Sequence, residues 1–246
     1  MSAADGERAL VTKLNSYVNA VKDPTLCTWK MVTGDHPTFG EKMISATWGD
    51  VASSANTNGH TDYVLDDENT YTIYNAVGLA WLAQQVNSGN SFEGKTIKLA
   101  NDIKLDIGLV SGYEYSGLEL GFTATVTAEN SWIPIGTMDE SLNALPFKGT
   151  FDGGNNTISR IFIRRNADYQ GLFGINGGVI KNLKTADQYI YSDGNYIGGF
   201  AGYNDGGTID NCSTAFYFKG SGNNIGAIAG QNNAGIIKNC SVLNGT

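Results

Sequence analysis

The sequence predicts an all-β fold, a right-handed parallel β-helix (solenoid) with an N-terminal helical cap region. Its main signal is a repeat: residues 196–212 (YIGGFAGYNDGGTIDNC) align without a gap with residues 224–240 (NIGAIAGQNNAGIIKNC), and residues 169–183 (YQGLFGINGGVIKNL) align after one deletion. Each repeat holds short runs of β-branched residues bounded by Gly, Asn and Asp, which indicate short strands joined by tight turns. Short strands at a fixed period, with no run long enough for a crossover helix, predict stacked coils.

Stacking places equivalent residues of neighbouring coils directly above one another, about 4.8 Å apart. Two inward apolar columns are expected, one of Phe173, Phe200 and Ile228 and one of Leu183, Cys212 and Cys240. Asn182, Asn211 and Asn239 should form a buried ladder whose amides bond from coil to coil. Just before them, Lys181, Asp210 and Lys238 alternate in charge, so that neighbouring rungs attract each other. These columns describe a scaffold.

The chain divides into residues 1–70, a helix plus an irregular or hairpin region, and residues 71–246, the solenoid. Apolar residues recur on one helical face from Asp5 to about Lys22, and Pro24 ends the pattern. Residues 26–45 are expected to form an edge strand or a hairpin. A second helix begins after Asn75, and Gly89 offers a left-handed stop. This helix, near residues 75–88, should cap the first coil, because an open solenoid end exposes strand edges and apolar side chains.

The segment from Asp106 to Ser131 is longer than a turn between coils requires. Long insertions on a rigid scaffold often carry function, so Tyr113, Tyr115 and Glu119 are the candidate ligand-binding residues. The alternative is a hairpin that packs its own aromatic side chains.

Composition excludes some classes of function. The formal net charge is −8 and the 16 basic residues are scattered, which argues against a nucleic-acid partner. No segment approaches the ~20 consecutive apolar residues of a membrane span, so no membrane insertion is expected. Residues 1–22 lack the apolar core of a signal peptide. The 3 cysteines make no disulfide framework, and Cys212 and Cys240 are expected to be buried reduced thiols.

No catalytic or metal-binding motif is evident, and no cofactor is expected. The chain has 2 histidines and neither lies in an HExxH pattern, and no GxSxG turn supports a serine nucleophile. A glycan-cleaving β-helix enzyme would need two carboxyl groups in one cleft. The available carboxylates are Asp152, Asp187, Asp193, Asp205 and Asp210. Asp- and Asn-rich turns could also bind calcium, but none forms a known ligand loop. The glycosylation patterns at Asn211 and Asn239 fall in the expected buried ladder, so they are interpreted as accidental.

Several phrases together resemble a known family. FKGTFDGGNNTISRI from Phe147, then GLFG, then GGFAGYNDGGTIDNC are similar to the GLUG-repeat family of bacterial secreted and surface proteins. The lead-in phrases YTIYNAVGLAWLAQQVNSG, FEGKTIKLANDIKL and WIPIG fit the same family, so the resemblance covers roughly residues 71–246. It implies an adhesin-like β-solenoid at the cell surface. Such repeats also occur in proteins related to immunoglobulin A peptidases. The motif residues are structural, so the resemblance carries over no catalytic position.

These observations predict a non-catalytic binding or adhesion module of a secreted or cell-surface protein. The expected partner is an extracellular macromolecule or a glycan, bound by a monomer located outside the cell. The alternatives are a polysaccharide-acting β-helix enzyme and a structural stalk of a larger, peptidase-related surface protein. Exposed tyrosine and tryptophan side chains along a flank, without convergent titratable groups, would favour the binding module over the enzyme.

Overall fold

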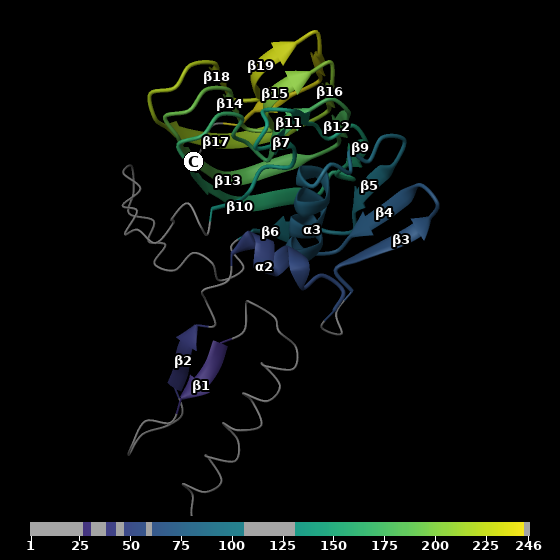
Figure 1. Cartoon of the computed structure of the whole chain (residues 1–246), viewed down its shortest axis with the longest axis vertical. Helices are drawn as coiled ribbons and strands as arrows, with labels where there is room; N and C mark the ends of the chain where they lie inside the picture. Colours follow the sequence, from purple (N-terminus) through teal and green to yellow (C-terminus); the bar gives the residue numbers. More distant parts are fainter. Residues whose placement is uncertain (1–26, 31–37, 43–46, 58–60, 106–130, 244–246) are drawn as a thin grey trace, which may run out of the picture.

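The computed structural model describes residues 27–30, 38–42, 47–57, 61–105 and 131–243, and for the first two of these ranges the backbone alone. Most of this part of the chain forms a β-solenoid of about five turns (Figure 1). The expected helix at residues 5–22 and residues 106–130 lie outside the described residues. Strands β1 (Cys27–Lys30) and β2 (Thr38–Lys42) pair antiparallel, which confirms a hairpin within residues 26–45.

Parallel strands stack along the sides of the solenoid. A seven-stranded sheet contains β3 (Tyr63–Asp67), β4 (Thr70–Ile73), β5 (Thr96–Leu99), β9 (Thr150–Asp152), β12 (Val179–Lys181), β16 (Thr208–Asp210) and β20 (Ile236–Lys238). A five-stranded sheet contains β6 (Ile103–Lys104), β10 (Thr157–Arg164), β13 (Lys184–Tyr191), β17 (Ser213–Lys219) and β21 (Ser241–Val242). Every neighbouring pair in these two sheets is parallel except β3 and β4, which form an antiparallel hairpin.

The remaining sides are shorter. A three-stranded sheet contains β11 (Phe173–Asn176), β15 (Ala201–Asp205) and β19 (Ala229–Asn233), and β14 (Ile197–Gly198) pairs with β18 (Ile225–Gly226). Strands β7 (Thr137–Met138) and β8 (Ala144–Leu145) form a small antiparallel hairpin. Below, coil 3 denotes residues 164–190, coil 4 residues 191–218 and coil 5 residues 219–243.

The spacing of the sequence repeat matches the register in which the strands pair. Gly198 lies opposite Gly226 and Lys181 lies opposite Asp210, as the repeat predicts. One expected column is wrong by a residue: Phe173 is in register with Ala201, not with Phe200. The cause is an extra residue in coil 4. Gln170 pairs with Ile197, and the same offset would pair Phe173 with Phe200. Phe173 instead pairs with Ala201, one position later. All of these inner side chains remain buried.

The core is a continuous apolar column inside the coils. In the seven-stranded sheet the residues in register are Ile97, Phe151, Ile180, Ile209 and Ile237. The first four are 0% exposed, whereas Ile237 in coil 5 is 37% exposed. The Phe173 ring lies 5.4 Å from the ring of Phe147 and 5.3 Å from that of Phe151. Burial of such side chains contributes roughly 1.5–3 kcal/mol each.

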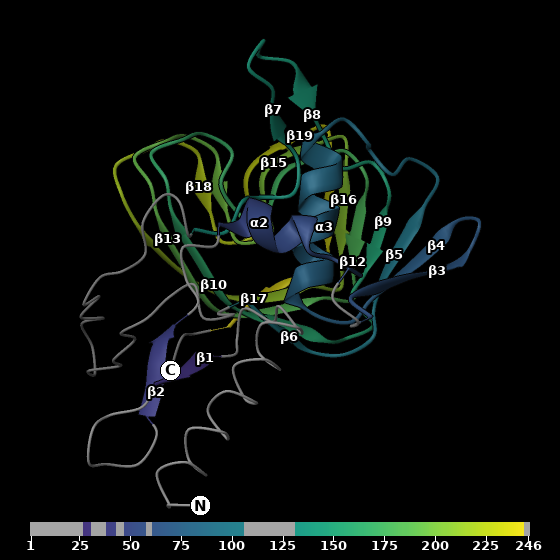
Figure 2. The ribbon, with the colours of Figure 1, turned by 60° about the horizontal axis from the view of Figure 1, so that its bottom comes forward.

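Helix α3 (Ala76–Asn87) closes one end of the solenoid, as expected. It replaces strands in the first turn, between the adjacent parallel strands β4 and β5. The Asn75 side chain caps it by accepting from the backbone N–H groups of Val77 and Gly78 at 3.0 and 3.1 Å. Helix α2 (Trp48–Ser53) packs beside α3, and both lie in front of the stacked coils in Figure 2. Within the described residues, no helix is both long and apolar enough to cross a membrane.

A buried carboxylate joins the parts of this cap. Asp62 is 1% exposed and accepts hydrogen bonds from the Asn56 backbone N–H and from Asn75 Nδ2, each at 2.8 Å. The aromatic rings of Tyr63 and Trp81 stack at 3.7 Å, and Trp81 also contacts Phe92 at 5.8 Å. These contacts pack the cap against the hydrophobic core that continues into the coils.

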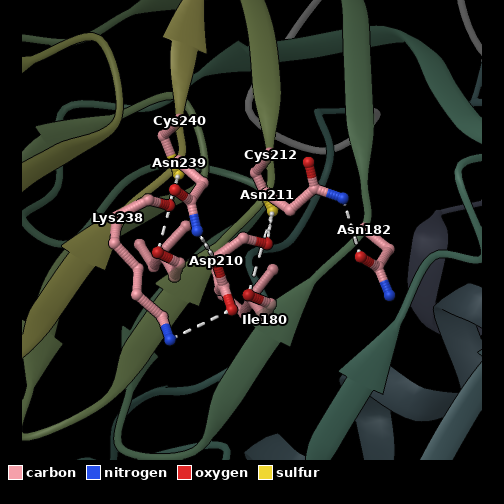
Figure 3. Close-up of polar contacts among 9 residues, drawn as sticks. Ile180, Asn182, Asp210, Asn211, Cys212, Lys238, Asn239 and Cys240 are labelled. Atoms are coloured by element: carbon pink, nitrogen blue, oxygen red, sulfur yellow. Dashed lines mark hydrogen bonds and ion pairs between the residues drawn. The ribbon is translucent and has the colours of Figure 1, made fainter.

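A charged ladder crosses the seven-stranded sheet. Lys98, Asp152, Lys181, Asp210 and Lys238 occupy consecutive rungs, so the predicted alternation extends further than expected. Lys181 Nζ lies 3.3 Å from Asp152 Oδ2, and Lys238 Nζ lies 3.3 Å from Asp210 Oδ2 (Figure 3). The Lys181–Asp152 pair is partly exposed, so it contributes at most about 1 kcal/mol, and the more exposed Lys238–Asp210 pair is screened more strongly by solvent.

The expected asparagine ladder exists, but its burial does not. Asn211 Nδ2 donates to Asn182 Oδ1 at 2.8 Å, whereas Asn239 Nδ2 donates to Asp210 Oδ1 at 2.9 Å (Figure 3). All three asparagines adopt the left-handed conformation, with φ between 52° and 54°. Asn211 and Asn239 are exposed because this turn points outward. Burial therefore gives no reason to set aside their glycosylation patterns.

A second asparagine ladder is the buried one. Asn176 Nδ2 donates to Asn204 Oδ1 at 2.7 Å, and Asn204 Nδ2 donates to Asn232 Oδ1 at 2.6 Å. Asn176 and Asn204 are 0% exposed, and each also donates to a glycine carbonyl two or three residues later. A Cβ at Gly207 would lie 2.3 Å from Asn176 Nδ2, so glycine is required there. This ladder satisfies polar groups inside the solenoid that would otherwise cost about 1–3 kcal/mol each.

Candidate ligand-binding surface

Three tyrosines gather where coils 3 and 4 turn into the three-stranded sheet. The rings of Tyr169 and Tyr196 stack at 5.0 Å with 8° between their planes. The Tyr203 ring lies edge-on to both, 5.9 Å from Tyr169 and 5.5 Å from Tyr196. All three side chains are partly exposed. We call these three residues the tyrosine cluster.

The backbone of the turn positions two of these rings. Tyr169 and Tyr196 both have φ of 61°, and Asn224 takes φ of 60° at the equivalent place in coil 5. The left-handed region is uncommon for a bulky residue and costs roughly 1 kcal/mol or more. Two tyrosines therefore occupy a conformation that asparagine adopts more easily. Local strain of this kind is frequent at functional sites.

Polar side chains form a ladder beside the tyrosine cluster. Asp168 Oδ1 accepts from the Asn195 backbone N–H at 2.7 Å and from its Nδ2 at 3.2 Å. Asn195 Oδ1 in turn accepts from the Asn223 backbone N–H and Nδ2, both at 3.1 Å. Asp205, at the end of β15, accepts from Asn233 Nδ2 at 2.8 Å. Aromatic rings thus lie next to amide and carboxylate groups on one surface.

The hydroxyls of Tyr169 and Tyr203 stay protonated at neutral pH, because their pKa values are raised. Burial is the main cause that raises the pKa of Tyr169 and of Tyr203 above the ordinary value of 10.0. Neighbouring Asp168 acts in the same direction on Tyr169, and Asp205 does so on Tyr203. A protonated phenol both donates and accepts hydrogen bonds. Tyr169 and Tyr203 therefore present neutral hydroxyls that can pair with hydroxyl groups.

The carboxylates of the charged ladder have lowered pKa values. Burial of Asp152 favours the neutral acid, but hydrogen bonds from Asn182, the Gly154 N–H and Lys181 outweigh it and lower the Asp152 pKa. The pKa of Asp210 is lowered as well, first by Asn239 and then by Lys238. Asp193 Oδ1 accepts from the backbone N–H and the hydroxyl of Ser221. Asp152 and Asp210 therefore serve as ionised acceptors within the scaffold.

The sequence-predicted residues Tyr113, Tyr115 and Glu119 lie outside the described residues. The tyrosine cluster was not predicted as a site, although Tyr169 and Tyr196 open two of the repeats and Tyr203 lies in the second. The available signal was the recurrence of tyrosine at the same place in two successive repeats. It was obscured because everything common to the repeats was interpreted as scaffold.

Two other features lack the chemistry of a ligand site. A pocket of about 180 Å³ lies between α2, α3 and Trp132, but its walls are mostly apolar and Trp132 Nε1 already donates to the Leu172 carbonyl at 3.1 Å. Its polar lining residues are Gln84, Asn87 and Ser88. Gln84 Nε2 donates to Ser53 Oγ at 3.2 Å, and Asn87 donates to the Pro134 carbonyl at 3.0 Å and accepts from the Gly136 N–H at 2.9 Å, so these two side chains are already engaged within the protein. Across the described parts of the chain, no three His, Cys, Asp or Glu side chains gather closely enough to hold a metal ion.

The cysteines of the inner column are free thiols. Cys212 is buried and Cys240 is partly buried, one coil apart. Burial raises the pKa of Cys212 to about 12 and also raises that of Cys240. Thiols of this kind are poor nucleophiles at neutral pH, because the thiolate is the reactive form.

Comparison with known proteins identifies the motif in coil 4. Residues 193–214 match the family model described as the GLUG motif, which confirms the resemblance seen in the sequence. This match contains Tyr196 and Tyr203 of the tyrosine cluster. A protein of Evansella cellulosilytica, provisionally named Gly-rich membrane protein, is 30% identical over 154 residues, which is 58% of this chain. The match spans 17% of that relative's length. No solved structure matches the chain.

Proposed function

We propose that this chain is a non-catalytic, glycan-binding module of a cell-surface protein. The observation that carries the proposal is the tyrosine cluster of Tyr169, Tyr196 and Tyr203 beside the polar ladder of Asp168, Asn195 and Asn223. The GLUG motif and the name of the relative, a membrane protein, support a surface location.

Glycans fit this surface because of their mixed chemistry. A sugar ring has an apolar C–H side that packs against aromatic rings, and hydroxyl groups that pair with amides, carboxylates and phenols. The cluster and its ladder supply each of these groups on adjacent turns. Repetition along the solenoid also matches a polymeric ligand, since equivalent positions recur from coil to coil.

A glycan-cleaving activity has less support. Glycosidic cleavage uses one carboxylic acid with a raised pKa and a second carboxylate at a defined distance. The pKa values of Asp152 and Asp210 are lowered, and a lysine rung separates them in the charged ladder. A purely structural stalk is the other alternative, and it would also account for the stacking of Tyr169 on Tyr196 between coils. Measured glycan binding that depends on the cluster separates the two functions.

The proposal is tested by binding of the purified chain to an array of glycans and extracellular-matrix proteins. For the best-bound glycan, we expect Tyr203→Ala and Tyr196→Ala to raise the Kd about tenfold, because an aromatic contact contributes ~0.5–1.5 kcal/mol and tenfold corresponds to about 1.4 kcal/mol. Tyr203→Phe keeps the ring and should lose less. Circular dichroism and the thermal midpoint confirm that each variant is folded.

Tyr74→Ala is the matched control, since Tyr74 is an exposed tyrosine directly after β4, distant in sequence from the cluster. It should leave the Kd unchanged. Binding that survives both cluster substitutions, or falls equally with Tyr74→Ala, would contradict this assignment of the surface. Release of reducing ends from a bound polysaccharide would favour the enzymatic alternative instead.

A further inference from the structure

The part of coils 3, 4 and 5 that carries the tyrosine cluster contains acidic residues and no basic ones. Its turns and its three-stranded sheet belong to residues 166–180, 192–209 and 220–235. We call these three stretches together the acidic flank. Their charged side chains are the carboxylates of Asp168, Asp193 and Asp205, and they contain no lysine, arginine or histidine. A ligand that complements this flank in charge is a cation.

Two of these carboxylates lie beside tyrosine rings. Asp168 directly precedes Tyr169, and Asp205 follows Tyr203 by two residues. Each uses Oδ1 to accept from an asparagine of the next coil. Within the described part of the chain, Oδ2 of Asp168 and Oδ2 of Asp205 take part in no hydrogen bond or ion pair. The same carboxylates help to raise the pKa values of Tyr169 and Tyr203, so their charge acts on the phenols.

The tyrosine rings themselves attract cations. An ammonium group within about 6 Å of a ring centroid is drawn to the negative face of the ring. Tyr203 stands at 84° to Tyr169 and at 78° to Tyr196, with centroids 5.9 and 5.5 Å apart. The cluster therefore presents rings in two nearly perpendicular orientations, next to carboxylate oxygens that the scaffold does not use.

Coil 5 supplies an internal comparison, because it contains no aromatic and no acidic residue. Gln231 lies opposite Tyr203, and Asn233 lies opposite Asp205. Asn224, in the left-handed turn of coil 5, donates to the Gln231 side chain at 3.1 Å. The same backbone is thus built without rings and without carboxylates. The two kinds of group occur together in coils 3 and 4 and are replaced together in coil 5.

A buried acceptor in the same turn has no donor. Gln170 is 4% exposed, and its Nε2 donates to the Asp168 carbonyl at 2.7 Å. Its Oε1 is buried and has no hydrogen-bond partner among the described residues. One further buried atom there lacks a partner, Nε of Arg165, whose guanidinium donates to the Ser131 carbonyl at 3.4 Å. The turn that carries Asp168 and Tyr169 therefore holds an unused acceptor, which suits a ligand that donates hydrogen bonds.

We propose that the tyrosine cluster selects glycans that carry protonated amino groups, namely polymers of amino sugars with free amines. This inference rests on the proposed glycan binding and adds the class of sugar. The sugar ring packs on a tyrosine ring, its hydroxyl groups pair with the polar ladder, and its ammonium group lies between a ring and a carboxylate. The same carboxylates disfavour glycans that bear acidic groups.

The experiment compares two glycan hexamers of equal linkage as ligands of the full chain, one of glucosamine and one of N-acetylglucosamine. At about pH 6 the free amines are charged, since an α-amino group has a pKa of about 7.7–8.0, whereas acetylated amines stay neutral. We expect calorimetry to give the glucosamine hexamer a Kd about tenfold lower than that of the acetylated hexamer. The difference should shrink at high salt, because exposed charges are screened.

Asp168→Asn and Asp205→Asn test the carboxylates with little change to the scaffold, because Asn195 and Asn233 already occupy the equivalent places one coil later. The double variant should raise the Kd of the glucosamine hexamer about tenfold and leave that of the acetylated hexamer unchanged. Glu68→Gln is the matched control, because it removes the same formal charge in the turn between β3 and β4, outside the acidic flank. It should change neither Kd. Circular dichroism confirms that each variant is folded.

Three outcomes would overturn the inference. Equal Kd values for the two hexamers, both raised by Tyr203→Ala, would leave glycan binding intact and remove the selection of amines. A preference for the amine that persists in the double variant would place the bound cation elsewhere. A lysine hexapeptide that binds as tightly as the glucosamine hexamer would show that charge alone is recognised. Failure of every glycan to bind would instead overturn the proposed function, and this inference with it.

Discussion

At one end of the solenoid α3 lies across the coils, whereas at the other end the strands of coil 5 have no neighbour among the described residues. The capped end turns from parallel to antiparallel pairing at β3, and its partly buried Tyr63 stacks on Trp81 of α3 against the core. The coil 5 end keeps the parallel register and leaves Ile237 and Val242 exposed. A repeat unit thus stabilises its neighbours but cannot close its own end. Closure needs a different sequence.

The largest predicted effect is a difference in the loss of unfolding free energy when equivalent isoleucines are replaced in an inner coil and in the end coil. Ile209→Ala removes a fully buried side chain and should cost about 3 kcal/mol of unfolding free energy, within the usual range of about 2–5. Ile237→Ala removes the equivalent residue at 37% exposure and should cost roughly 1 kcal/mol. Urea unfolding of both variants provides the comparison. Equal losses would mean that coil 5 is covered as completely as coil 4.

A smaller effect is expected at the cap. Asn75→Ala removes the N-cap of α3 and the donor to the buried Asp62 carboxylate, and should cost about 2 kcal/mol. Asn75→Ser keeps a capping oxygen and should recover about half of that loss. The measurement is the same urea unfolding. If Asn75→Ala left the stability unchanged, closure by α3 would not depend on its first turn.

The smallest effect is the pH dependence of the charged ladder. The folded pKa of Asp152 lies below the ordinary value of 3.8, so its stabilisation is present above that pH and is lost as the pH falls through the folded pKa. The contribution is expected to stay under about 1 kcal/mol, because the pairs are partly exposed. Thermal midpoints between pH 5 and pH 2 should fall less steeply for Asp152→Asn than for the parent. An identical fall of the thermal midpoint in both proteins would show that the charged ladder does not contribute to stability in acid.

Much of the scaffold could be predicted because periodicity fixes which residues stack. The pairing of Gly198 with Gly226, the charge alternation of Lys181, Asp210 and Lys238, and the helix after Asn75 all follow from spacing and local propensity. What spacing does not fix is which side of the turn faces inward. Left-handed residues such as those of the Asn182 ladder break the alternation of a strand, so the prediction placed that ladder in the interior and did not identify the buried ladder of Asn176, Asn204 and Asn232.

The candidate site was less accessible to sequence reasoning. Tyr169 and Tyr196 open successive repeats and Tyr203 comes from the following strand, so their contact depends on how the corner of coil 4 accommodates its extra residue. A single insertion shifts a register without changing composition or pattern. For the same reason Phe173 could not be assigned to the correct partner in the next coil.

The two asparagine ladders have opposite directions along the solenoid. In the buried ladder each amide donates to the next coil, from Asn176 to Asn204 to Asn232, whereas Asn211 donates back to Asn182. Two such bonds run one way and one runs the other, so their amide dipoles offset each other in part. An α-helix accumulates a macrodipole as its peptide units align. Side-chain ladders of opposite direction accumulate less dipole along the solenoid than ladders that run the same way would.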